Sequence, residues 1–427
     1  LHFRVKIEVK LWNASDLRQK TARNFGLERL PAFYKSGFLA SFHYIIRQSH
    51  PRYFSRLDAK VCAMGSVSVI VPCYNYGRFL RECVESILSQ PVGVRVLIID
   101  DASTDDTPRV AAELAARDHR VQVRSHPVNR GHIATYNEGL EWISEDYTLL
   151  ISADDLLAPG ALLRACKLMD AHPEVGFVYG RLIRWRTDQP RPVLQPSSEE
   201  FEWVIMSGHE YIETVCKKGP PTISPEVVVR TQLQRELGGY CHELPHWADV
   251  EMLMRFAAHA PVGYINEFQA YYRIHECNMN LRYPWRSIQE LEQRRTAFRA
   301  LFDHHGRRIE NAEQLRALVH YRLAEVAFWE AHRAFDRDEV ETCKAYLEFA
   351  VETDPEIVLW KSYSRLRWKF AIGPKVWALV RPIWDRISHL IPLSAHLLLF
   401  RLLIKPVFRA SRTEYLRITD SLRDRVS

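Results

Sequence analysis

Hydrophobic and polar positions follow two alternating patterns from residue 66 to about residue 180. Short apolar runs, which we predict to be buried strands, lie at residues 66–71, 94–99, 121–124, 147–151 and 176–180. Longer segments with apolar residues at helical spacing lie between them, at residues 79–89, 107–118, 133–143 and 159–169. Strands that alternate with helices in this way build parallel βαβ units. We therefore predict an α/β fold with one Rossmann-like, mixed and mostly parallel sheet that is flanked by helices.

The pattern becomes less regular after residue 180. Residues 181–208 are rich in Pro, Ser, Glu and Trp, and we predict a long loop there. Further strands are predicted at residues 226–230, 262–265 and 271–275. A helix is predicted at residues 246–259. The α/β domain is thus expected to span residues 64–283.

Everything after residue 283 has helical periodicity. Helices are predicted at residues 288–304, 311–335 and 338–353. The last two form a hairpin across residues 336–338, similar to a single degenerate tetratricopeptide-type unit. We therefore predict an all-helical C-terminal region over residues 284–427.

The first 63 residues show no repeating strand–helix pattern. The chain begins with Leu1, and Met64 lies shortly before the first clear strand. We interpret residues 1–63 as an upstream extension that is not part of the native protein. The alternative is a genuine helical arm, since residues 38–46 can form an amphipathic turn or two.

Composition is ordinary for a globular protein, with 47% apolar and 26% charged residues, but charge is unevenly distributed. Residues 361–427 contain 14 Lys or Arg against 4 Asp or Glu, a net charge of +10, so the rest of the chain carries −4 of the total of +6. Aromatic and aliphatic residues are interleaved with this basic charge at residues 376–384 and 397–405. Such a tail suits the interface of an anionic membrane, or alternatively a basic helix packed on its own domain.

Cysteine spacing and hydropathy indicate the compartment. The eight cysteines are scattered and form no Cys-x-x-Cys or zinc-type spacing, which favours free thiols in a reducing compartment. No apolar run approaches the ~18 residues that are needed to cross a bilayer. We expect a cytoplasmic protein with peripheral contact to the inner face of the membrane.

Acidic residues recur where the predicted sheet would present its ligands. They are Asp100 and Asp101 after the second strand, Asp154 and Asp155 after the fourth, and Asp249 with Glu251 at the start of a late helix. Ligands bind at the carboxyl ends of strands in open α/β sheets, and paired carboxylates suit a hard divalent cation that also holds phosphates. The alternative is that these acids merely begin turns and helices, where a carboxylate is also stabilised by the helix dipole.

The first strand-to-helix turn, residues 72–77, lacks the glycines of a dinucleotide-binding loop. No phosphate-binding loop of the Gly-x-x-x-x-Gly-Lys-Ser/Thr type occurs in the chain either. These two absences argue against a nicotinamide-dependent dehydrogenase and a P-loop phosphotransferase. A nucleotide bound here would have to be held by side chains and by a metal ion.

Four segments together resemble the family 2 glycosyltransferases. They are residues 69–75 (Val-Ile-Val-Pro-Cys-Tyr-Asn), residues 97–107, residues 129–139 and residues 152–155 (Ser-Ala-Asp-Asp), in the family's order and spacing. The resemblance covers about residues 66–280. It implies a GT-A fold and inverting transfer of a sugar from a nucleotide-diphosphate-sugar to an acceptor hydroxyl.

The resemblance also implies roles for individual residues. Those expected to bind the nucleotide-sugar are Pro72, Tyr74, Asn75, Asp101, Asn137 and Asp154. Asp155 and His275 are expected to contact a divalent cation, Mn²⁺ or Mg²⁺. Asp249 corresponds to the catalytic base. For His275 the alternative of an ordinary loop histidine stays open.

Two positions depart from the family's pattern. Many members carry an acid where Ser152 and Ala248 stand in this sequence, which bears on the metal's affinity and on the tuning of the base. We predict a glycosyltransferase whose acceptor is a glycan, a polysaccharide or a lipid-linked saccharide, with no nucleic-acid partner. The alternative is a non-catalytic protein that binds sugar nucleotides or assists assembly through its helical tail. Retention of Asp101, Asp155 and Asp249 favours the enzyme.

Overall fold

The computed structural model describes residues 65–194, 201–222, 224–278 and 284–360, together with part of residues 361–382. The chain divides into two compact units, Leu1–Ala63 and Met64–Ser427. The described residues all belong to the second unit. The predictions for residues 1–63, and for the basic tail beyond residue 382, lie outside the described residues.

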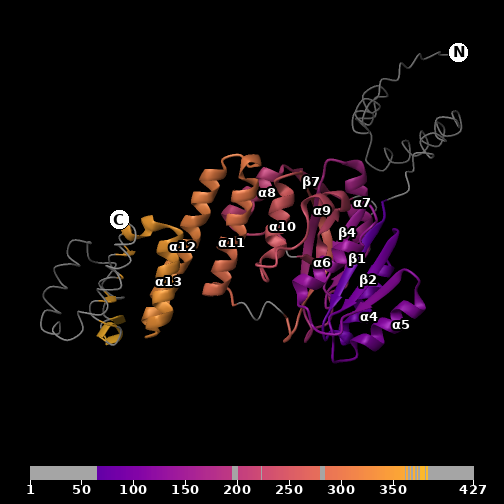
Figure 1. Cartoon of the computed structure of the whole chain (residues 1–427), viewed down its shortest axis with the longest axis horizontal. Helices are drawn as coiled ribbons and strands as arrows, with labels where there is room; N and C mark the ends of the chain where they lie inside the picture. The colour runs from indigo at the N-terminus through magenta and orange to yellow at the C-terminus, as the bar shows by residue number, and fades with distance from the viewer. Residues whose placement is uncertain are drawn as a thin grey trace, which may run out of the picture. The chain divides into compact units, whose positions relative to one another are not determined.

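In the described part of the chain, nine strands form one sheet in the order β3-β2-β1-β4-β8-β6-β9-β5, with β7 also paired to β9 (Figure 1). The strands are β1 (Val67–Cys73), β2 (Val94–Asp100), β3 (Val121–Ser125), β4 (Tyr147–Leu150), β5 (Leu156–Leu157), β6 (Phe177–Arg186), β7 (Trp203–Met206), β8 (Val228–Arg230) and β9 (Val262–Ile274). The pairs β1–β2, β2–β3, β1–β4 and β6–β9 are parallel. The pairs made by β5, β7 and β8 are antiparallel. This arrangement confirms the predicted α/β fold with a mixed sheet.

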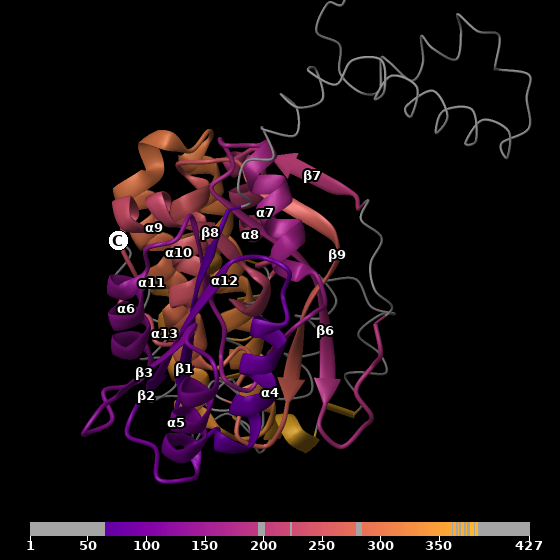
Figure 2. The same ribbon diagram turned by 90° about the vertical axis from the view of Figure 1, so that its right-hand side faces the viewer.

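Helices cover both faces of the sheet, as Figure 2 shows. Their bounds are α4 (Gly77–Leu88), α5 (Thr107–Arg117), α6 (His132–Trp142), α7 (Ala161–Ala171), α8 (Gly208–Lys218), α9 (Thr231–Leu237) and α10 (Ala248–Ala257). Successive side chains of β1 point to opposite faces of the sheet and pack into two separate hydrophobic cores. Val67, Val69 and Val71 pack with α4, α5 and α7, whereas Ile70 packs with α6, α8 and α10.

The prediction of a long loop at residues 181–208 is wrong. Strand β6 continues to Arg186, β7 occupies Trp203–Met206, and α8 begins at Gly208. The two strands predicted at residues 262–265 and 271–275 are one strand, β9, which pairs with β6 through register shifts at residues 180–182. The outer half of β6 carries three arginines and has no apolar run, so its pattern does not indicate a strand. Strand β7 is apolar but only four residues long, Trp203–Met206, within a segment rich in Pro, Ser and Glu. Helices α8 and α9 were also not predicted.

Strand β1 does not end before Pro72, as its sequence suggested, but continues to Cys73. The Ile151 N–H donates to the Ile70 carbonyl, and the Asp101 N–H donates to the Cys73 carbonyl. Even-numbered residues of β1 therefore bond toward β4, and odd-numbered ones toward β2. Since β4 ends at Leu150, the N–H that Pro72 lacks would have had no strand partner, so proline is tolerated there.

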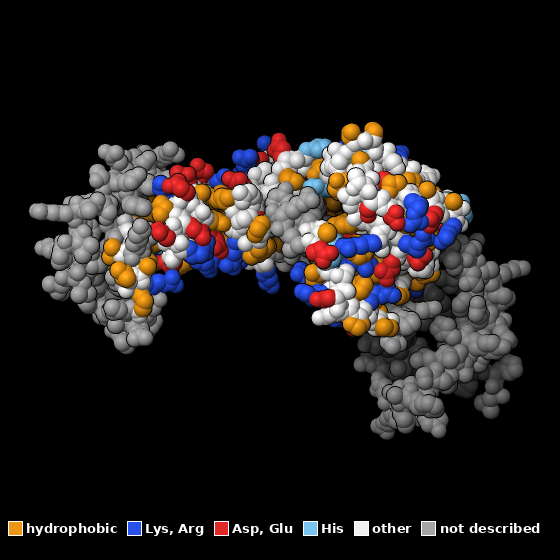
Figure 3. Space-filling model, turned by 90° about the horizontal axis from the view of Figure 1, so that it is seen from below, with side chains coloured by type: hydrophobic (Ala, Val, Ile, Leu, Met, Phe, Trp, Pro, Cys, Tyr) orange, Lys and Arg blue, Asp and Glu red, His pale blue; other side chains and the backbone are white. Residues whose placement is uncertain are grey.

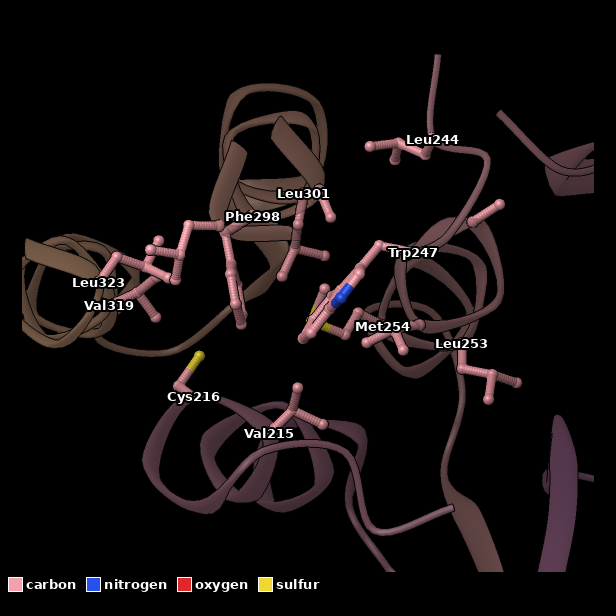
Figure 4. Packing of buried hydrophobic residues seen from close by; sticks show 14 of the residues in the cluster. Val215, Cys216, Leu244, Trp247, Leu253, Met254, Phe298, Leu301, Val319 and Leu323 are labelled. Atoms are coloured by element: carbon pink, nitrogen blue, oxygen red, sulfur yellow. The ribbon is translucent and has the colours of Figure 1, made fainter. Parts of the chain in front are cut away.

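The C-terminal helices share a hydrophobic core with the sheet domain. The helices are α11 (Ile288–His305), α12 (Ala312–Asp336) and α13 (Val340–Thr353), which confirms the predicted helical region and its hairpin as far as the structure describes them. One cluster of buried residues joins α8 and α10 to α11 and α12 (Figure 4). Trp247, next to α10, packs in it against Phe298 of α11, with a ring-centroid separation of 6.1 Å. The helical region thus forms part of the support of the sheet domain.

Acidic and basic side chains are interspersed on the face shown in Figure 3. The basic excess noted in the sequence belongs to residues 361–427, most of which lie outside the described residues. Among the residues that were searched, no helix combines the length and apolar character needed to cross a membrane.

Candidate active site

The loops that follow β1 and β2 are tied together by the side chain of Asn75. This residue has a left-handed backbone with φ 57°, a conformation that asparagine tolerates better than most residues. Its Oδ1 accepts a hydrogen bond from the Thr104 N–H at 2.8 Å, and its own N–H donates to the Ser103 Oγ at 2.9 Å. Its Nδ2 makes no hydrogen bond to the described residues, and the neighbouring Tyr74 ring is 43% exposed. Asn75 and Tyr74 can therefore both meet a ligand at this edge, beside the buried Pro72.

Asp101 is a buried carboxylate at the end of β2. It accepts hydrogen bonds from the backbone N–H groups of Arg130 at 2.7 Å and Gly131 at 2.9 Å. The His126 Nδ1 lies 2.7 Å from its Oδ1, and the opposite ring nitrogen lies 3.0 Å from Glu138. A carboxylate has about four acceptor sites, and three are used here. Asp101 thus fixes the loop before α6 and keeps capacity for one further donor.

Asp154 and Asp155 lie side by side in a buried turn after β4. The turn is closed by the Asp155 N–H, which donates to the Ser152 carbonyl at 3.0 Å. Strand β9 holds both acids through Arg273: its N–H donates to the Asp155 Oδ1 at 2.8 Å, and its Nε donates to the Asp154 carbonyl at 2.6 Å. The two carboxylates therefore have fixed backbone positions before any ligand arrives.

The Arg273 guanidinium is itself held on several sides. Its Nη2 donates to Glu82 of α4 at 2.6 Å. Its central carbon lies 4.6 Å from the ring centroid of Phe79 and 4.6 Å from that of Trp185. A planar cation between two aromatic faces is well suited to this role, because guanidinium stacks as well as donates.

His275 contacts Asp154 at the end of β9. Its Nε2 lies 3.0 Å from the Asp154 Oδ2, and its Nδ1 accepts from the Cys277 N–H at 3.2 Å. These partners assign the ring proton to Nε2, so that His275 donates to Asp154. Asn278 adds a second, longer donor to the same oxygen at 3.4 Å. The other oxygen of Asp154, Oδ1, is buried and has no hydrogen-bond partner among the described residues.

This pair of acids fits a divalent cation. Burial raises the pKa of Asp155 well above its ordinary value, and the charge of Asp154 raises it further. A buried carboxylate pair with one unpartnered oxygen is stabilised by a hard cation, whose charge removes their repulsion. Among the residues searched, no group of three or more His, Cys, Asp or Glu side chains is arranged to hold a metal ion. The remaining ligands would therefore be phosphate oxygens and water, as is usual for Mg²⁺.

Asp249 lies in the first turn of α10 and is half-buried. The helix start is anchored by α11: the Trp247 Nε1 donates to the buried Glu290 at 3.2 Å, and the His246 N–H donates to Gln293 at 3.2 Å. Figure 4 shows Trp247 directed from α10 toward α11. The position of Asp249 is thus fixed by the helical region as well as by its own helix.

Tyr136 of α6 packs against His132 and Tyr240, with ring-centroid separations of 5.5 Å and 5.2 Å. Burial raises the pKa of Tyr136, and the nearby charges of Asp249, Asp154 and Asp155 raise it further. One phenol therefore lies within electrostatic reach of all three carboxylates.

Asn137 makes contacts within the protein rather than toward open space. Its Nδ2 donates to the Tyr240 carbonyl at 2.9 Å, and its Oδ1 accepts from the Tyr240 N–H at 2.8 Å. It thereby links α6 to the loop before α10. Its direct contact with a nucleotide-sugar stays a prediction.

Sequence reasoning missed three residues of this region: Arg273, Tyr136 and His126. Arg273 lies inside the segment 272–275 that was singled out for its histidine, and Tyr136 precedes Asn137. Nothing in their spacing indicated which partners they would meet. Each acts through a contact with a distant part of the chain, which a sequence motif does not encode.

Comparison with known proteins supports the family resemblance of the sequence motifs. The model of glycosyl transferase family 2 matches residues 68–219. The putative glycosyltransferase EpsE of Bacillus subtilis is 29% identical over 215 residues, which is 49% of this chain and 73% of EpsE. Glycosyltransferase GlyG of Streptococcus pneumoniae is 36% identical over 118 residues, 26% of this chain and only 39% of GlyG.

Solved structures share the fold. The structure of Staphylococcus aureus TarS, residues 1–349, in complex with UDP superposes with a TM-score of 0.51 over 69% of this chain and 82% of that one, at 18% identity. The sheet domain thus has the GT-A fold that the sequence motifs implied. On its motifs, its fold and its relatives, the chain contains a domain that matches glycosyl transferase family 2, a family of enzymes, over residues 68–219.

Proposed function

We propose that the protein is an inverting, metal-assisted glycosyltransferase. It would transfer a sugar from a nucleotide-diphosphate-sugar to a hydroxyl group of a glycan, polysaccharide or lipid-linked saccharide. The observation that carries the proposal is the buried pair Asp154 and Asp155 after β4, in which Asp154 Oδ1 has no hydrogen-bond partner among the described residues. A buried carboxylate pair suits a cation that binds a diphosphate, and Asp249 is a further acid that can act as the base.

The donor would be held at the carboxyl ends of the parallel strands. Pro72, Tyr74 and Asn75 would line the nucleoside pocket, with Asp101 accepting from a ring N–H of the base. Asp155 and the free oxygen of Asp154 would hold Mn²⁺ or Mg²⁺. Such a cation stabilises the negative charge of the departing nucleoside diphosphate. His275 would hold Asp154 in place through its Nε2–H, and a direct contact of His275 with the cation stays a prediction.

In the proposed reaction, Asp249 in the first turn of α10 acts as the base. The acceptor oxygen would form a bond to the anomeric carbon while the bond from that carbon to the diphosphate oxygen breaks. Asp249 would take the proton of the attacking hydroxyl, a contribution of about 10²–10⁴ in rate. Attack on the face opposite the leaving group inverts the anomeric configuration.

The test is release of nucleoside diphosphate from a panel of UDP-, GDP- and dTDP-sugars, with Mn²⁺, with Mg²⁺ and with EDTA. UDP-GlcNAc is a natural first donor, since TarS has been crystallised with it. We expect Asp249→Asn and Asp155→Ala each to lower the rate by at least ~10²-fold. Asp106→Asn, a matched change at an exposed acid, should have no effect.

Nucleoside diphosphate release that survives both substitutions would refute the assigned mechanism. Donor binding without turnover in any condition would favour the non-catalytic alternative. A control for Asp249→Asn is donor affinity, which should be retained because the base acts on the acceptor.

Cytoplasmic location and peripheral membrane contact are also part of the proposal. The location rests on the scattered cysteines, and the membrane contact rests on the basic residues that are interleaved with aromatic and aliphatic ones in residues 361–427. Cosedimentation with anionic vesicles at low salt should exceed that with neutral vesicles, because interfacial basic residues are attracted to anionic headgroups. Equal recovery in the supernatant with both vesicle types would contradict membrane contact.

A further inference from the structure

The ring of His126 lies between two carboxylates. Its Nδ1 is 2.7 Å from the Asp101 Oδ1, and its Nε2 is 3.0 Å from the Glu138 Oε2. The side chain is only 6% exposed, and the His126 N–H donates to the Asp100 carbonyl at 2.9 Å. Because His126 directly follows β3, it joins the end of that strand to the end of β2 and to helix α6.

The contacts of Asp101 determine which of its oxygens can meet a ligand. Oδ1 accepts from the Arg130 N–H at 2.7 Å and from the His126 Nδ1, which carries the ring proton because a carboxylate only accepts. Both acceptor sites of Oδ1 are therefore used. Among the described residues, Oδ2 accepts only from the Gly131 N–H, at 2.9 Å. One acceptor site remains, and it is on Oδ2.

The contact with His126 removes freedom that this carboxylate would otherwise have. Rotation of a terminal carboxylate is broad and roughly two-fold, so two backbone donors alone allow it to tilt. A third donor, on Oδ1, fixes its plane. Glu138 keeps the His126 ring from turning, because it lies against the opposite nitrogen. Glu138 is itself held by the Arg130 Nη1 at 2.6 Å.

A second histidine holds an acid in the same way at the acidic turn. The His275 Nε2 lies 3.0 Å from the Asp154 Oδ2, while the Asp154 Oδ1 has no hydrogen-bond partner among the described residues. In both pairs an enclosed histidine occupies one carboxylate oxygen, and the other oxygen keeps capacity for a ligand. The repetition favours a role for His126 in presenting Asp101 to a ligand.

We propose that His126 is a positioning residue for the nucleobase: it holds the Asp101 Oδ1 and leaves one acceptor site, on Oδ2, for a ring N–H. This rests on the proposed function, in which Asp101 accepts from the base, and deepens it by naming a residue that sets the choice of nucleotide. Uracil, thymine and guanine carry a ring N–H beside a carbonyl group, whereas cytosine and adenine present a bare ring nitrogen. A fixed acceptor rejects a bare nitrogen, because two acceptors then face each other.

The experiment compares two polar substitutions of His126 by calorimetric titration with UDP, GDP, dTDP, CDP and ADP in the presence of Mn²⁺. His126→Asn keeps an amide donor near the position of Nδ1, and His126→Gln places it near Nε2 instead. We expect wild type to bind at least one nucleotide with a ring N–H ~10-fold more tightly than CDP and ADP. His126→Gln should reduce this preference about 3- to 10-fold, the value of one hydrogen bond, and His126→Asn should retain it.

His119→Gln is the matched control, because the His119 side chain just before β3 is 96% exposed and its loss should change no affinity. Thermal unfolding of each variant verifies that it is folded. An unchanged preference in His126→Gln would overturn the proposal, as would an equal loss in His126→Asn. Equal weakening of all five nucleotides would show a purely structural role and overturn it too. Failure of wild type to bind any of them would instead overturn the proposed function.

Discussion

Replacing Arg273 tests whether the acidic turn is held by strand β9. The side chain is 5% exposed and contacts α4, the turn and two aromatic rings at once. Arg273→Lys keeps the charge but loses the planar fork, so it cannot reach Glu82 and the Asp154 carbonyl together. Arg273→Ala removes all of these contacts. The backbone N–H that bonds to Asp155 is retained in both variants.

The magnitude follows from the contacts. Each charge-assisted hydrogen bond contributes about 1.5–3 kcal/mol, and each cation–π contact about 0.5–2 kcal/mol. These values are not additive for groups that share one side chain. Loss of one partner of a buried ion pair costs about 3–5 kcal/mol. Glu82 is 43% exposed and can be solvated when its partner is lost. We therefore expect the free energy of unfolding to fall by ~3 kcal/mol in Arg273→Ala and by ~1–2 kcal/mol in Arg273→Lys.

The assay is guanidinium chloride unfolding, combined with the Mn²⁺ concentration that gives half-maximal activity. We expect both variants to require more Mn²⁺, since the Asp154 carbonyl is no longer fixed, while binding of the nucleoside diphosphate alone changes less. Arg109→Lys, in an exposed ion pair of α5, is the control and should leave the stability unchanged, because exposed pairs are screened by solvent. A loss for Arg273→Ala no larger than that of the control would refute the reasoning.

Three further predictions concern the supports of the site and the helical region. Trp247→Phe removes the donor to Glu290, so Asp249 loses its fixed position. We expect kcat to fall about 10-fold while the affinity for the donor stays unchanged, and equal changes in kcat and donor affinity would contradict this. Gly139→Ala places a methyl group 2.5 Å from the Ile70 side chain and should cost ~1–3 kcal/mol in thermal unfolding, whereas a neutral effect would show that α6 can shift. Burial lowers the pKa of His332 from 6.5 to about 4, so the folded protein holds this histidine neutral. Its contribution to the free energy of unfolding is fully present above pH ~6.5, and up to ~3 kcal/mol is lost as the pH falls toward 4. His332→Gln should flatten that part of the stability–pH curve, and an unchanged slope would contradict the assignment.

The parallel half of the sheet was predictable because its strands are buried on both faces. Strands β1, β2 and β4 are almost entirely buried, so they appear as uninterrupted apolar runs that end in polar residues. The outer half of β6 alternates between exposed and half-buried residues, and β7 is exposed or half-buried throughout. Arginines interrupt the outer half of β6, and the apolar run of β7 is only four residues long. Helix α9 spans only Thr231–Leu237, too short for a clear helical period.

The candidate site was also predictable from the sequence only in part. The positions of Asp101, Asp154 and Asp155 followed from strand order alone, because parallel strands present their carboxyl ends at one edge. The sequence also indicated Asp249 through family resemblance. It did not indicate that Asn137 binds the backbone of Tyr240 instead of facing open space.

Tertiary structure decided which groups hold the acids in place. Arg273 meets Asp155 across 118 positions of sequence, and His275 meets Asp154 across 121. Such pairs depend on the return of β9 along the sheet, a long-range pairing that no local pattern encodes. The sequence by itself determined the strands and the acids at their ends, since burial and strand direction are local properties. Only the folded chain determined their partners, because these depend on contacts between distant segments.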